Sequence, residues 1–266
     1  MDSKHFPKFK FNLSDVEYFL LNKRNYKDLA AHMKRTDNHR LLVMSTDDES
    51  GWNEDYLPGM DSFDFLEELS IHWTKVDDIT EAHKCKNVKT LLLDNGDKTK
   101  LDYSVFTKLE NFVSWDRKGI ENIWDVSGLK TLTVAGLKRN HFKIGKAMET
   151  INKLRIITTP VDNIDFLGNC RQLTFLELKG MSKLEKMDIL GTLTDLIHLR
   201  IEANKVRDFS FIAKLINLQK CYLSSKSAEM KYEDFINFKD IKKLVVDGNN
   251  KALEVDRLLQ KFYGNG

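Results

Sequence analysis

The residue types that most often carry catalysis are scattered through this sequence and form no recognisable motif. Seven histidines and three cysteines are spread over 266 residues, and no histidine lies at metal-ligand spacing from acidic residues. The sequence has no glycine-rich phosphate loop, HExxH zinc motif, GxSxG nucleophile turn or dinucleotide-binding fingerprint. We therefore expect a protein that is not an enzyme and that holds no metal or cofactor.

Other residues are suited to binding a macromolecule, because Trp, Tyr and Arg are enriched at the energetic centres of protein interfaces. Our candidates for partner binding are Trp73, Leu92, Trp115, Arg155, Phe175, Glu177, Arg200, Glu202 and Tyr222. These residues are far apart in the chain. Most of them occupy a few equivalent positions of a repeating pattern, which should bring them onto a common surface.

The pattern is a series of LxxLxL units, each succeeded by a stretch with a period of three. In the segment from Leu199 to Cys221, for example, apolar residues occupy every third position from Val206 onward. The units start at residues 66, 88, 109, 129, 151, 173, 196, 218 and 241, so successive starts are 20 to 23 residues apart. A chance match would not keep so narrow a spacing over nine copies, and this period indicates a repeat architecture.

The repeat resembles the leucine-rich repeat, in particular the short repeats of bacterial internalins and SDS22-like proteins. The resemblance covers residues 66–249, and the unit that starts at Leu196 is the closest copy. The asparagine that comes after the strand in this family is kept at Asn204 and Asn249. The resemblance implies an α/β fold: a leucine-rich-repeat solenoid with a curved parallel β-sheet, a convex side of 3₁₀ and short helices, and caps at both ends.

Both periods of the sequence fit one coil of such a solenoid. The LxL segment predicts a short strand whose side chains alternate between core and surface. The period of three after it predicts 3₁₀ helix, in which residues three apart lie on one side. Cys85, Cys170 and Cys221 fall at apolar positions of the repeat. We expect them to be reduced thiols in the core, as in a cytoplasmic protein.

The sequence predicts one structural domain in three parts. Residues 1–60 form an amino-terminal cap and loop, residues 61–250 the repeats, and residues 251–266 a capping helix. Within the first part, residues 26–35 have the pattern of a short helix and residues 40–45 that of an additional strand.

The repeat register predicts which side chains share the concave face. Equivalent residues of neighbouring strands should lie about 4.8 Å apart, so Arg155, Glu177, Arg200 and Tyr222 form consecutive members of one row. The alternating charges of this row also suit ordinary cross-strand pairs on a solvated surface, without any partner.

The two candidate tryptophans also have an alternative to partner binding. Trp73 and Trp115 occupy positions that the repeat itself does not bury. They could instead pack under the long polar loop of residues 46–60.

Composition does not identify a partner. The chain has 42 basic and 40 acidic residues and a formal net charge of +2, so no overall field favours nucleic acid or an anionic membrane. It has no run of 18 apolar residues and no apolar segment typical of a signal peptide at its start. We therefore expect a cytoplasmic protein without a membrane partner.

These observations favour a non-catalytic protein-binding scaffold. Its resemblance to small bacterial leucine-rich-repeat proteins implies an immunity protein that binds and blocks a cognate toxin domain. The alternative is a cytosolic regulator or scaffold of an endogenous enzyme, as the SDS22-like resemblance implies. An enzyme without a local motif is a minor alternative. So is nucleic-acid binding along the strip from Lys153 to Lys243, which acidic residues interrupt.

The charge of a toxin partner would decide which residues contact it. Arginines on the concave face would bind carboxylates through their planar guanidinium groups. A basic nuclease toxin would instead pair with acidic residues, of which the candidates are Asp94, Asp116, Glu177, Glu202 and Asp247.

Overall fold

The computed structural model describes residues 6–10, 16–48, 50–138 and 142–263. The chain divides into two compact units, Met1–Leu129 and Lys130–Gly266. In each unit, consecutive strands pair in chain order, and short 3₁₀ helices occupy most of the connections between them. Among the described residues, no helix has both the length and the apolar character needed to span a membrane.

The described part of the amino-terminal unit contains six strands. Its elements are β1 (Lys8–Lys10), β2 (Glu17–Leu20), α1 (Tyr26–Arg35), β3 (Arg40–Met44), η2 (Asp61–Phe63), β4 (Glu68–His72), η3 (Thr80–Lys84), β5 (Thr90–Asp94), η4 (Tyr103–Val105), β6 (Asn111–Trp115) and η5 (Ile120–Asp125). Strands β1 and β2 are antiparallel, and the pairs from β2 to β6 are parallel.

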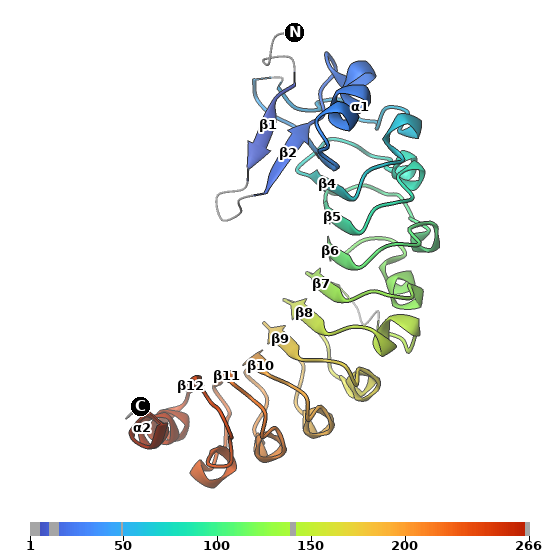
Figure 1. Cartoon of the computed structure of the whole chain (residues 1–266). Helices are drawn as coiled ribbons and strands as arrows, with labels where there is room; N and C mark the ends of the chain where they lie inside the picture. The colour runs from blue at the N-terminus through green and yellow to red at the C-terminus, as the bar shows by residue number, and fades with distance from the viewer. Residues whose placement is uncertain (1–5, 11–15, 49, 139–141, 264–266) are drawn as a thin grey trace. The chain divides into compact units, whose positions relative to one another are not determined.

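Six strands also lie in the carboxyl-terminal unit, over residues 130–138 and 142–263, and their pairs are parallel. Its elements are β7 (Thr131–Ala135), η6 (Lys146–Glu149), β8 (Lys153–Ile157), η7 (Asp165–Asn169), β9 (Phe175–Lys179), η8 (Asp188–Thr192), β10 (His198–Glu202), η9 (Ser210–Lys214), β11 (Lys220–Ser225), η10 (Tyr232–Phe235), β12 (Lys243–Gly248) and α2 (Asn250–Tyr263). Within this unit the strands lie along one side and the 3₁₀ helices along the other (Figure 1).

The core is built from the two periods of the repeat. The strand residues Leu176 and Leu199 are fully buried, and so are Phe209 and Ile212 of the three-residue period. Side chains between the strand leucines point to the opposite, open face of the sheet, because successive strand residues alternate in direction. This alternation confirms the predicted register and determines which residues can meet a partner.

The three cysteines confirm the same register. Cys85, Cys170 and Cys221 are buried and unpaired. Burial raises the pKa of the Cys85 and Cys170 thiols to about 12, and it raises the pKa of Cys221 as well. These thiols therefore act as small apolar side chains of the core.

The predicted fold class, a leucine-rich-repeat solenoid capped at its ends, is confirmed. All nine predicted repeat strands form, as do the additional strand β3 and the helices α1 and α2. Strands β1 and β2 were not predicted, since no LxxLxL unit contains them. The organisation as one structural domain stays a prediction.

One detail of the repeat register differs from expectation. Ser70 occupies the repeat position equivalent to Arg155, Glu177 and Arg200, which the register places on the open face, but it is fully buried. It pairs in register with Leu42, which belongs to an apolar cluster with Tyr18 and Leu20 of the unpredicted strand β2. That strand extends the sheet and adds apolar cover to a face that the repeats alone would leave open.

The two family-type asparagines behave differently. The side chain of Asn249 donates to the carbonyl of Ala228 over 2.7 Å and accepts from the backbone N–H of Ala252 over 3.0 Å. Asn204 is exposed. The turn after β10 instead uses backbone bonds, in which the Ala203 N–H donates to Ser224 and the Val206 N–H to Ala203.

Candidate functional site

The largest group of predicted site residues meets on the open face of β8 to β11. Strand register places Glu177 of β9 between Arg155 of β8 and Arg200 of β10. Tyr222 of β11 lies next to Arg200 on the other side. We name this surface the β8–β11 face; it consists of Arg155, Phe175, Glu177, Arg200, Glu202 and Tyr222.

One carboxylate holds both arginines of this face. Arg155 Nε lies 3.1 Å from Glu177 Oε2, and Arg200 Nε lies 3.5 Å from Glu177 Oε1. Arg200 also donates to Glu202, with its Nε at 3.1 Å from Glu202 Oε1. The hydrogen bond to Glu202 raises the pKa of Arg200 further above its usual value. The network fixes the directions of two long side chains that would otherwise sample many rotamers.

Each arginine is also placed against an aromatic ring. The Arg155 guanidinium carbon lies 5.0 Å from the centre of the Phe175 ring, and that of Arg200 lies 4.5 Å from the Tyr222 ring. Both distances are within the range of cation–π attraction. Phe175 in turn lies against His198, with 4.4 Å between ring centres. Burial and the nearby charge of Lys220 lower the pKa of His198, so this ring is neutral at pH 7.

Apart from Asp247 of β12, the charges that remain unpaired on this side of the described sheet are positive. Glu177 and Glu202 are paired with arginines. The neighbouring lysines have no ion-pair partner within the part of the chain that the structure describes; they are Lys153, Lys179, Lys220 and Lys243. The β8–β11 face thus combines ordered arginines, aromatic rings and surplus positive charge.

The other three predicted site residues belong to the amino-terminal unit. Trp73 directly follows β4 and is 64% exposed, and Trp115 ends β6 and is 48% exposed. Leu92 of β5 is partly exposed on the open face. The alternative in which both tryptophans pack under the loop of residues 46–60 is wrong, because both are exposed, and the loop buries its own Trp52, Leu57 and Met60 instead.

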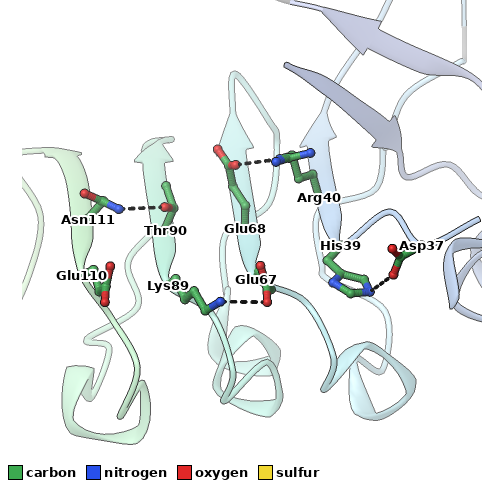
Figure 2. A pocket seen from close by; sticks show the side chains of 9 residues that line it. All are labelled: Asp37, His39, Arg40, Glu67, Glu68, Lys89, Thr90, Glu110 and Asn111. Carbon is green, nitrogen blue, oxygen red and sulfur yellow. Dashed lines mark hydrogen bonds and ion pairs between the residues drawn. The ribbon is translucent and has the colours of Figure 1, made fainter. Parts of the chain in front are cut away.

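A groove at the amino-terminal ends of β3 to β6 was not predicted. It has a volume of about 310 Å³ and is lined by Asp37, His39, Arg40, Glu67, Glu68, Lys89, Thr90, Glu110 and Asn111. Figure 2 shows that its side chains pair across neighbouring strands, with Arg40 beside Glu68 and Lys89 beside Glu67. Glu67, Lys89 and Glu110 directly precede β4, β5 and β6. Charged residues at this one position of consecutive repeats are the sequence signal that could have predicted the groove.

The chemistry of this groove is that of paired surface charges. Lys89 Nζ lies 2.9 Å from Glu67 Oε1, and Arg40 Nε lies 3.4 Å from Glu68 Oε2. The lining lacks a serine or cysteine that a base could activate. Over the described ranges, no group of three or more His, Cys, Asp or Glu side chains could hold a metal ion. The contacts that the groove does contain are ion pairs across neighbouring strands.

Comparison with known proteins supports the fold. No protein-family model matches the chain, and no curated protein sequence matches it. The solved structures of similar fold include an internalin, inlF, from Listeria monocytogenes. It is 16% identical over 86% of this chain and 74% of that chain, with a TM-score of 0.58.

Two further solved structures are similar. The leucine-rich-repeat domain of the type III effector XopL is 12% identical over 87% of this chain and 86% of that chain, with a TM-score of 0.51. TLR13 in complex with ssRNA13 is 17% identical over 81% of this chain, with a TM-score of 0.53, and the match spans 34% of the TLR13 chain. At such low identity the likeness establishes the leucine-rich-repeat fold.

Proposed function

We propose that this chain is a non-catalytic scaffold that binds another protein through the β8–β11 face. The observation that carries the proposal is the arrangement of Arg155 and Arg200, each stacked on an aromatic ring and both held by Glu177. Arginine and aromatic side chains are the types that dominate binding energy at protein interfaces. The fold leaves them on an open surface, where they contribute little to the core.

The fixed conformations of Arg155 and Arg200 favour a role in binding over a purely structural role. Exposed ion pairs stabilise a folded protein by only about 0–1 kcal/mol. Immobilising a flexible side chain at an interface costs about 0.5–1.5 kcal/mol. The ion-pair network already fixes Arg155 and Arg200 in the free protein. Binding of a partner to them therefore loses less side-chain conformational entropy. Arg200 then offers the remaining donors of its guanidinium group to a partner carboxylate.

Protein is favoured over nucleic acid as the partner. A structural neighbour, TLR13, is solved with ssRNA13, and the surplus lysines of the β8–β11 side would attract phosphates. However, Glu177 and Glu202 lie within that surface, so its basic residues do not form the continuous strip that a phosphate backbone would follow. A protein can place carboxylates opposite the lysines and neutral groups opposite the glutamates.

Within this class, the partner we propose is a cognate bacterial toxin domain in the cytoplasm, which the chain would neutralise as an immunity protein. The likeness to bacterial leucine-rich-repeat structures supports a bacterial setting. Inhibition would be by stoichiometric occlusion, with no turnover and no cofactor. The alternative is an endogenous enzyme partner that the chain regulates, as SDS22-like proteins do.

Co-expression with the product of the adjacent upstream gene tests the toxin proposal, because an immunity gene directly follows its toxin gene. The chain should restore growth and co-purify with that product, and Arg200→Ala should lose both effects while its thermal stability is kept. Lys214→Ala, an exposed change on η9 away from the sheet, is the matched control and should protect fully. A harmless upstream product that does not co-purify would exclude the immunity role and favour the endogenous regulator.

A further inference from the structure

Positive charge in the carboxyl-terminal unit is concentrated in one row of its open face. At the amino-terminal ends of β8 to β12, strand register aligns one residue of each strand: Lys153, Phe175, His198, Lys220 and Lys243. We name these five residues the lysine row; it contains three lysines, two rings and no acidic residue. We propose that the lysine row binds an acidic segment of the partner protein and places one of its carboxylates beside His198. This inference rests on the proposed function, since it assumes that a protein binds this side of the sheet.

The side chains around His198 form one connected cluster. The ring centres of His198 and Phe175 are 4.4 Å apart, and the Arg155 guanidinium carbon lies 5.0 Å from the centre of the Phe175 ring. Lys220 is the register partner of His198 on β11, on the side opposite Phe175. His198 is partly exposed and Lys220 is exposed. A ligand on the open face can therefore reach the imidazole ring between cationic residues of β8 and β11.

The electrostatic field at His198 is positive. Burial lowers the pKa of this imidazole, and the charges of Lys220, Arg155 and Arg200 lower it further. Glu177 acts in the opposite direction, but it already pairs with both arginines. A carboxylate that binds beside the ring would be attracted by these cations and would favour the imidazolium form of His198.

The length and composition of the lysine row fit a protein segment. Strands are about 4.8 Å apart, so the row runs about 19 Å from β8 to β12, which an extended chain covers with about six residues. Its lysines are exposed and unpaired within the described ranges. The neutral rings of Phe175 and His198 separate Lys153 from the other two lysines. A protein segment can alternate acidic and apolar side chains to match this order, whereas a nucleic acid carries a phosphate at every nucleotide.

A short acidic peptide tests this proposal without the natural partner. The intact chain would be titrated with acetyl-hexaglutamyl-amide, and the imidazole signals of its seven histidines followed by NMR. Acetyl-hexaglutaminyl-amide is the neutral control of equal length. The His198 signal should shift with hexaglutamate alone, and the pKa of His198 measured from this signal should be higher in the bound state. Hexaglutamate should therefore bind more tightly as the pH falls from about 7.5 to about 6, because binding takes up a proton.

Two variants make the test decisive. Lys220→Ala should weaken hexaglutamate binding about fivefold, because it removes a cation next to His198. Lys214→Ala, an exposed change on η9, is the matched control and should bind as the wild type does. An unmoved His198 signal, equal shifts with hexaglutamine, or unchanged affinity in Lys220→Ala would each overturn the proposal. Tighter binding of single-stranded hexathymidylate than of hexaglutamate would overturn it in favour of nucleic acid.

Affinity capture from lysate separates this proposal from the proposed function. A partner that Arg200→Ala loses, but that Lys220→Ala and wild type retain equally, would show that the β8–β11 face binds a protein without the acidic segment. Loss of the same partner with both variants, together with the His198 shift, would support both proposals.

Discussion

Glu177 forms ion pairs with arginines on two neighbouring strands, and these contacts organise the β8–β11 face. Its two oxygens lie 3.1 Å from Arg155 Nε and 3.5 Å from Arg200 Nε. The sequence predicted this row of alternating charges, because a strand period of two and a repeat of about 22 residues fix which residues are neighbours. It could not predict that each arginine also lies over a ring, since that depends on side-chain rotamers.

A substitution on the same strand as Glu177 tests the register at the residue scale. Leu176 of β9 is fully buried, so Leu176→Ala should lower the free energy of unfolding by about 2–5 kcal/mol. Lys179→Ala, on the exposed side of this strand, is the control and should change it by less than about 0.5 kcal/mol. Urea denaturation measures both values. A loss below about 1 kcal/mol for Leu176→Ala would show that the assigned register is wrong.

At the scale of elements, the sequence predicted what the repeat determines and missed what lies outside it. The LxxLxL units gave nine strands, and apolar spacing gave α2. Strand β2 was missed because it has only four residues and no repeat partner upstream. The groove of Figure 2 was missed because its residues precede the strand leucines and pair through flexible charged side chains. Trp73 and Thr158 have left-handed backbones, with φ of 45° and 49°, and neither residue type predicts that conformation.

The connection from η3 to η4 gives a prediction on pH. The Asp102 N–H donates to His83 Nε2 over 3.0 Å, which requires a neutral ring. Burial lowers the pKa of His83 below its usual value of 6.5, although Asp102 and Asp78 act in the opposite direction. The unfolded chain therefore binds more protons than the folded chain just below pH 6.5. Stability is complete above this pH and falls as the pH drops toward the folded pKa.

His83→Gln should weaken this pH dependence without removing it, because the pKa values of His32, His72 and His198 are also lowered. Melting temperatures measured from about pH 7.5 to 5.5 should fall less steeply for the variant than for the wild type. Parallel curves for the two proteins would show that the hydrogen bond from Asp102 does not couple His83 to stability.

At the scale of the whole molecule, the formal net charge is only +2, although individual surfaces differ in charge and in aromatic content. The β8–β11 face has arginines on aromatic rings beside unpaired lysines. The amino-terminal unit instead presents two exposed tryptophans, Trp73 after β4 and Trp115 at the end of β6. Total charge therefore could not predict a partner, whereas the repeat register located most of the residues concerned. The identity of the partner depends also on the surface of the partner itself, which the sequence of this chain does not encode.

Quantitative affinity capture tests the central claim, that the β8–β11 face binds a protein, most directly. Wild type, Arg200→Ala and Lys214→Ala would serve as parallel baits in lysate of cells that carry the gene, after equal melting temperatures are confirmed. Mass spectrometry should find a protein that wild type and Lys214→Ala retain equally and that Arg200→Ala loses by about tenfold or more. The same captured proteins at the same levels with Arg200→Ala would contradict the claim.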